Sequence, residues 1–189
     1  MRAPGESAQG LPLPWRMPRS EQRKSVAARF AREAQRFAEW ADGSACADRL
    51  SVPVALRRVA QLYTEALTLP QPWSEGVSVR REEAPVFLEA RMNQVRLRAA
   101  AIPLQHYSEI YSPLVPPDPP VVGDLADDLV AIYRDVALGL HLHARGCIDD
   151  ALWQWGFGFQ MRWGQHASSA IRALHCYLAQ EDPSGLCSD

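Results

Sequence analysis

The chain has 189 residues, of which 47% are hydrophobic and 22% charged, and its formal charge is −2. This composition is typical of a globular protein and excludes a wholly disordered or collagen-like chain. The nearly balanced charge gives no sign of a nucleic-acid-binding surface or of attraction to an anionic membrane. No stretch approaches the ~20 consecutive apolar residues of a membrane span.

The cysteines and the N-terminal segment indicate the compartment. The four cysteines are irregularly spaced and form no Cys-x-x-Cys pair, which argues against a disulfide framework or a zinc knuckle. Residues 1–19 are rich in proline and lack the apolar run of a signal peptide. Only one of the 20 basic residues is lysine, a bias typical of GC-rich genomes. We therefore expect a cytoplasmic bacterial protein with a disordered tail over residues 1–19.

Apolar residues at helical spacing predict the first three helices. They cover residues 20–41, residues 52–69, and a segment from about Glu83 to the residue before Pro103. Ser51 is a favourable N-cap for the second helix.

A proline-rich segment separates the third helix from the fourth. Residues 107–111 are predicted to form a short turn, and residues 112–120 a stiff extended connection. The fourth helix is predicted from Asp124 to Arg145, and Gly146 suits the left-handed residue that ends it.

The tryptophan-rich segment that follows fits two secondary structures. Large apolar side chains alternate with polar residues or glycine over residues 153–163, which is nominally a strand pattern. No other segment offers a convincing partner strand, and a lone strand leaves its backbone unpaired. We therefore predict a helix over residues 148–180, kinked near Gly164. The whole pattern predicts one all-α domain over residues 20–182, a bundle of five or six helices with a long antiparallel C-terminal helical hairpin, and a frayed end at 183–189.

Several short segments of the C-terminal half carry a family resemblance. They are YSEIYSPL (107–114), GDLADDL (123–129), IYRD (132–135), Trp153-x-Trp155, WGQHA (163–167) and A-x-RALH (170–175). Their order and spacing, over about residues 107–178, resemble the bacterial domain-of-unknown-function family 5063. The resemblance implies a small, cytoplasmic, helical protein, and it favours the helical interpretation of the tryptophan segment. That family has no assigned activity, so the resemblance transfers no catalytic residue.

Three aspartates of the fourth helix form a candidate metal site. Asp124, Asp128 and Asp135 fall within roughly 40° of one another on a helix, and aligned carboxylates can hold Mg²⁺ against a diphosphate. Helical enzymes of this kind need a second acidic motif, whereas Asp149-Asp150 and Glu82-Glu83 both lie at predicted helix ends. The simpler interpretation is that the acids at 124, 127 and 128 stabilise the helix N-terminus. We expect no metal and no cofactor.

A second candidate is a polar cluster between the last two long helices. Arg162 and His166 are four residues apart and share a helical face. An antiparallel hairpin places Asp128 and Asp135 at about their level, and a buried charge needs a partner of opposite sign. We predict that these four side chains lie together, with a structural role favoured over binding of a metal or ligand.

The tryptophans are a third candidate. Trp153, Trp155 and Trp163 form either part of the core or an aromatic pocket or surface for a ligand or partner. A small bundle has difficulty covering so many aromatic side chains, which favours a homodimer.

The sequence leaves two hypotheses for function. One is a non-enzymatic protein- or self-interaction module, with an unknown protein partner or a second copy. The alternative is a metal- or phosphate-dependent helical hydrolase that uses the aspartates of the fourth helix. The chain contains neither a Gly-x-Ser-x-Gly elbow nor a phosphate-binding loop, so the first is preferred.

Overall fold

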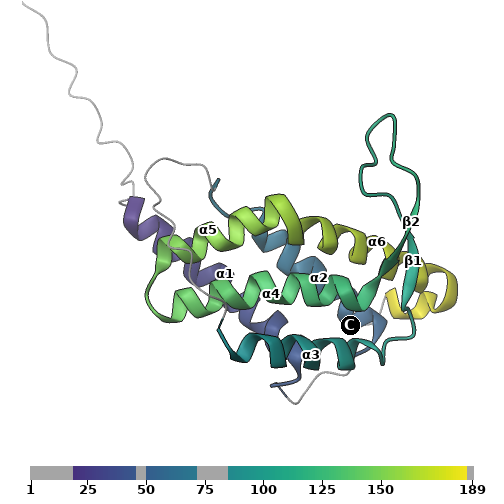
Figure 1. Cartoon of the computed structure of the whole chain (residues 1–189), viewed down its shortest axis with the longest axis horizontal. Helices are drawn as coiled ribbons and strands as arrows, with labels where there is room; N and C mark the ends of the chain where they lie inside the picture. Colours follow the sequence, from purple (N-terminus) through teal and green to yellow (C-terminus); the bar gives the residue numbers. More distant parts are fainter. Residues whose placement is uncertain (1–18, 46–49, 72–84, 187–189) are drawn as a thin grey trace, which may run out of the picture.

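Figure 1 shows the protein as a computed structural model, which describes residues 19–45, 50–71 and 85–186. The described part is a bundle of helices with one small antiparallel sheet, which confirms the predicted all-α class. The elements in chain order are α1 (Arg19–Asp42), α2 (Val52–Ala66), α3 (Phe87–Ala99), β1 (His106–Glu109), β2 (Val121–Asp124), α4 (Leu125–Ala144), α5 (Ile148–Gly158), the π-helical turn η1 (Phe159–Trp163), α6 (Gly164–Glu181) and the 3-10 turn η2 (Pro183–Leu186).

Helix α4 lies at the centre of the bundle (Figure 1). It packs against α1, α3, α5 and α6, while α2 packs against α1 and α6. Leu129, Ile132 and Val136 recur at spacings of three and four residues and are all buried, as a core-facing helical stripe requires. Because it has neighbours on several sides, side chains on more than one face of α4 are buried.

The ends of α4 follow the sequence pattern closely. The Asp124 carboxylate accepts hydrogen bonds from the backbone N–H groups of Ala126 and Asp127, so it is the N-cap of the helix. Gly146 follows the helix with a φ of +78°, the left-handed conformation that favours glycine. At the start of α2, Ser51 occupies the N-cap position, but its side chain makes no capping hydrogen bond.

The hairpin of β1 and β2 was not predicted. The two strands pair antiparallel, with Tyr107 opposite Gly123, so the expected turn over residues 107–111 is wrong for its first part. Figure 1 shows the connection between the strands extending away from the helices. Each strand has only four residues and pairs across a proline-rich connection, so the local pattern carries little sign of the pairing.

The tryptophan segment is helical, as predicted. A π-helical turn, residues 159–163, separates α5 from α6 and lies directly before Gly164, where a kink was expected. A Cβ atom at Gly164 would lie 2.1 Å from the backbone oxygen of Phe159, so only glycine fits there. The period-2 pattern arises because this segment is buried on several sides, with glycines at close contacts.

Some sequence predictions lie outside the described residues. These are residues 1–18 of the tail predicted over residues 1–19, and the cysteines at positions 46 and 187. The last residue of that predicted tail, Arg19, is instead the first residue of α1. At the C-terminus, where fraying was expected, residues 183–186 form the turn η2 against α6 and α2. None of the helices in the described ranges is long and apolar enough to cross a bilayer.

Candidate functional site

Two acid–base pairs connect α4 to the segment formed by η1 and α6. His166 Nδ1 lies 2.8 Å from Asp128 Oδ1, and Arg162 Nη2 lies 3.1 Å from Asp135 Oδ1. The structure thus brings the four residues of the predicted polar cluster together as two contacting pairs. The carboxylate side chains are only 5% and 3% exposed, whereas those of His166 and Arg162 are 39% and 45% exposed. Each pair therefore combines a buried acid with a base that reaches the surface.

Asp128 has a second partner, which the sequence analysis missed. The Tyr107 hydroxyl donates a hydrogen bond to Asp128 Oδ2, so both carboxylate oxygens are occupied. Asp128 lies in the first turn of α4, where a negative charge is favourable as predicted, but its side chain makes no capping hydrogen bond and instead contacts Tyr107 of β1 and His166 of α6. Burial, and next the hydrogen bond with Asp128, raise the pKa of Tyr107 well above its usual value. The phenol consequently stays protonated and serves as a hydrogen-bond donor.

Gly123 makes room for this contact. A Cβ atom at Gly123 would lie 2.6 Å from the ring of Tyr107, the residue opposite it in the sheet. The ring therefore lies across the glycine, with its hydroxyl directed at α4. The hairpin thus places Tyr107 beside the Asp128–His166 pair, and the three side chains form one hydrogen-bonded group.

The imidazole of His166 lies in a field that favours its protonated form. Its hydrogen bond with Asp128 is the main cause that raises the pKa of His166. Burial opposes this shift, the negative charge of Glu109 adds to it, and the positive charge of Arg134 opposes it. The pair can therefore hold a proton at pH values where a free imidazole loses it.

The environment of Asp135 disfavours its ionised form. Burial raises the pKa of the Asp135 carboxyl, and the charges of Arg162 and Arg134 offset part of that shift. Among the described residues its Oδ2 atom has no hydrogen-bond partner. A Cβ atom at Gly158 would lie 3.1 Å from this oxygen, so α5 packs closely over the carboxylate.

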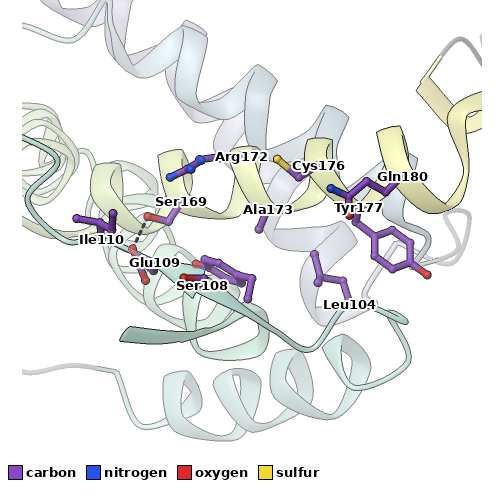
Figure 2. Close-up of a pocket in the computed structure, with 11 residues that line it drawn as sticks. Leu104, Ser108, Glu109, Ile110, Ser169, Arg172, Ala173, Cys176, Tyr177 and Gln180 are labelled. Atoms are coloured by element: carbon purple, nitrogen blue, oxygen red, sulfur yellow. Dashed lines mark hydrogen bonds between the residues drawn. The ribbon is translucent and has the colours of Figure 1, made fainter. Parts of the chain in front are cut away.

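A second polar contact, between β1 and α6, lies beside a cavity. The Ser169 hydroxyl donates to Glu109 Oε1, and Glu109 is only 7% exposed. Both side chains line a cavity of ≈270 Å³ between β1 and α6 (Figure 2). Tyr107 and Glu109 are two residues apart, so on a strand they share one face. If His106–Glu109 had been interpreted as a strand, Tyr107 and Glu109 would have been expected to face the helices together, whereas the predicted turn gave no such indication.

The tryptophan candidates belong mostly to the core. Trp155 and Trp163 are fully buried, and their indole N–H groups donate to the backbone oxygens of Val136 and Trp155 respectively. Trp153 is half-buried and stacks on Phe157, with ring centroids 4.6 Å apart. An aromatic surface at Trp155 and Trp163 is therefore wrong, because neighbouring helices cover both rings.

The aligned aspartates do not form a metal site. Within residues 19–45, 50–71 and 85–186 no three side chains of His, Cys, Asp or Glu are placed to hold a metal ion. Asp124 caps its helix, Asp128 binds Tyr107 and His166, and Asp135 binds Arg162. The contacts of Asp128 hold the hairpin on the bundle through Tyr107 and favour the protonated form of His166.

These features define a class of protein: a helical bundle with a β hairpin fastened to its central helix. Residues 21–180 match the model of the family described as Domain of unknown function (DUF5063). The chain belongs to that family, as its motifs predicted. No curated protein matches the chain.

A solved structure shares the fold. The crystal structure of protein BF1032 from Bacteroides fragilis has 21% sequence identity to this chain and a TM-score of 0.53. The match covers 86% of this chain and 92% of the other. At this identity the likeness shows the common fold alone.

Proposed function

We propose that this protein is a non-enzymatic self-interaction module, in which strand β2 pairs with β2 of a second copy. The observation that carries the proposal is the open edge of the hairpin. The sheet consists of β1 and β2 alone in the described part of the chain, so β2 has a neighbour on one side only. Unpaired strand edges are ready templates for pairing with another chain.

The side chains around this edge are apolar and exposed. Val122 in β2 is 76% exposed, and Leu114 and Val115 in the connection are 75% and 96% exposed. Between residues 110 and 120 the only charged residue is Asp118. Monomeric proteins usually protect such edges with charged side chains, above all lysine, with proline or with very short strands. Strand β2 is short and follows Pro120, but it carries no lysine, and its one charged residue, Asp124, caps α4.

A second copy is the partner that suits this edge. The hydrogen-bonding pattern of an antiparallel strand edge is self-complementary under a twofold axis. With the axis at Val122, this valine faces its own counterpart, and Asp124 lies opposite Pro120 of the other chain. No like charges then meet. The connection between β1 and β2 extends away from the helices (Figure 1).

The strand edge, and not a tryptophan surface, forms the interface in this proposal. Trp155 and Trp163 cannot supply the interface, because they are buried. We place the module in a reducing cytoplasm, which is supported by the free thiols of Cys147 and Cys176.

The test is the association state of a variant with a charge on the edge. We expect sedimentation equilibrium of the wild type to give a dimer at tens of micromolar. Val122→Lys should be monomeric, because two lysines would face each other across the axis. Leu97→Lys is the matched control. Leu97 is 72% exposed and belongs to α3, outside the hairpin, so this variant should dimerise normally. A monomeric wild type, or a Val122→Lys protein that dimerises as the wild type does, would contradict the proposal.

A further inference from the structure

The cavity between β1 and α6 has the size of a small-molecule site. Its volume is ≈270 Å³, close to the lower end of the range of ligand pockets, about 300–1,000 Å³. A nucleotide is too large for it, whereas a metabolite of a few heavy atoms fits. Figure 2 shows that one wall comes from β1 and the residues around it and the other from α6.

One end of the cavity carries two opposite charges that do not pair with each other. Glu109 is 7% exposed and accepts one hydrogen bond from Ser169. Arg172, one turn further along α6, is exposed and makes no hydrogen bond or ion pair with any other described residue. In Figure 2 the two charged side chains lie on either side of Ser169.

Among the described residues Glu109 has no ion-pair partner. Its hydrogen-bond partner Ser169 is a neutral donor, and the charge of Glu109 also acts on Tyr107 and His166. His166 already forms its direct ion pair with Asp128. A mostly buried carboxylate without a cation in contact is costly, so an ammonium group in the cavity would be stabilised there.

The other end of the cavity is mostly apolar, with the amide of Gln180 beside Tyr177. Leu104, Ala173 and the ring of Tyr177 line it, away from the charged end (Figure 2). An aliphatic group of the ligand would lie against these side chains, as in most small-molecule sites.

We infer that this cavity binds an apolar α-amino acid, with its ammonium group on Glu109, its carboxylate on Arg172 and its side chain toward Leu104 and Tyr177. A zwitterion satisfies both charges at once. A simple carboxylate would be repelled by Glu109, and a simple amine by Arg172. The site lies on the α6 side of β1 and does not depend on the pairing of β2.

The test is calorimetric titration of the full-length protein with L-leucine, L-isoleucine, L-valine and L-methionine. For the tightest of these, analogues lacking one charged group are compared; for leucine they are 4-methylpentanoate and 3-methylbutylamine. Each analogue should bind roughly tenfold more weakly or worse, since a charge-assisted contact is lost. Failure of all four amino acids to bind at about 10 mM, or analogues that bind as tightly as the amino acid, would overturn the inference.

Variants separate the roles of the two charges. Glu109→Gln and Arg172→Gln should each weaken amino-acid binding by roughly tenfold or more. Arg32→Gln, an exposed arginine on α1, is the control and should bind as the wild type does. Because Arg172 is exposed, its variant remains informative even if Glu109→Gln fails to fold. Normal affinity in Arg172→Gln would exclude the proposed orientation.

Alkylation of Cys176 gives an independent readout. This exposed cysteine lines the cavity, so a bound amino acid should slow its reaction with iodoacetamide. Cys147 is the internal reference, because it lies at the start of α5, outside this cavity. Equal slowing at both cysteines, or none at Cys176 under saturating ligand, would contradict occupancy of the cavity.

Discussion

Asp135 is a buried carboxylate with incomplete compensation. Arg162 lies 3.1 Å and Arg134 3.5 Å from its Oδ1 atom, while Oδ2 has no partner among the described residues. Burial is the dominant influence on its pKa, which is raised. The fold therefore holds this charge at a cost, and the two arginines reduce that cost.

Removal of Arg162 should consequently destabilise the protein. We expect Arg162→Ala to lower the free energy of unfolding by about 1–3 kcal/mol, measured by urea denaturation at neutral pH. The loss stays below the 3–5 kcal/mol typical of a fully buried pair, roughly, because the arginine side chain is 45% exposed and water screens part of the interaction.

The Asp135→Asn background separates charge from packing. In that background Arg162→Ala should cost less than it does in the wild type, because the amide leaves no uncompensated charge. An equal cost in both backgrounds would mean that Arg162 acts through the packing of its aliphatic stem.

His166 should make stability depend on pH. Its pKa is raised above the ordinary value of 6.5, chiefly by the hydrogen bond with Asp128. A raised folded-state pKa means that the stabilisation is complete below 6.5 and is lost as the pH rises through the folded-state value. We therefore expect the wild type to lose stability as the pH rises above 6.5 and through the folded-state pKa of His166, and His166→Gln to lose less over the same pH range.

The control residue for this prediction, His175, lies on the opposite face of the same helix. His175 is exposed, so His175→Gln should keep the pH dependence of the wild type. Thermal denaturation at matched ionic strength measures all three proteins. Parallel pH profiles for wild type and His166→Gln would exclude the histidine–aspartate pair as the source of the dependence.

At the scale of elements, the contact between α4 and α5 depends on a glycine. A Cβ atom at Gly139 would lie 2.0 Å from the indole nitrogen of Trp155, and this indole donates to the backbone oxygen of Val136. Helix propensity alone favours alanine by ~1 kcal/mol. We nevertheless expect Gly139→Ala to destabilise by about 1–3 kcal/mol, measured by chemical denaturation, because the buried ring has no free space into which it can move.

Gly146→Ala provides the contrast. A Cβ atom at Gly146 would meet no atom within 4 Å, but the residue has a φ of +78°. Its cost should be about 1 kcal/mol from backbone strain alone. If Gly139→Ala proved stabilising, the close approach of α4 and α5 would be looser than the structure indicates.

The helices were predictable because their apolar stripes are local signals. The fourth helix was expected from Asp124 to Arg145 and is found at Leu125–Ala144. The hairpin was not predicted, since its strands have four residues each and gain their pairing partner only through the fold. The alternating pattern of the tryptophan segment has the same origin, because burial on several sides removes the single-face periodicity.

The candidate site was also predictable in part: the contacts between helices were expected, and those made through the hairpin were not. Arg162 and His166 share a helical face, and the antiparallel packing of α4 against α6 sets the level of Asp128 and Asp135, so sequence spacing was sufficient. Tyr107, Glu109 and Ser169 were missed because they meet through β1. Burial of the tryptophans was one of the two interpretations of the sequence, and the choice between them depends on small residues of other helices such as Gly139.

At the scale of the molecule, the polar contacts fix the hairpin on the bundle. Tyr107 binds Asp128 of α4, Glu109 binds Ser169 of α6, and the backbone oxygen of Tyr111 accepts from the side chain of Gln165. A hairpin of two strands is marginal by itself. These three contacts therefore hold β2 in one orientation, which reduces the entropy that pairing with a second copy would cost.

Association of this kind predicts a melting temperature that depends on protein concentration. If β2 pairs with β2 at a Kd of about 10 µM, an increase from about 1 to about 100 µM stabilises the folded chain by about 0.9 kcal/mol, because much of the protein is already dimeric at the higher concentration. For a protein of this size that corresponds to roughly 2–4 °C. Val122→Lys should melt at the same temperature at both concentrations, while Leu97→Lys should follow the wild type. Scanning calorimetry at the two concentrations measures the difference, and a wild-type transition that does not move would contradict coupling between folding and association in this range.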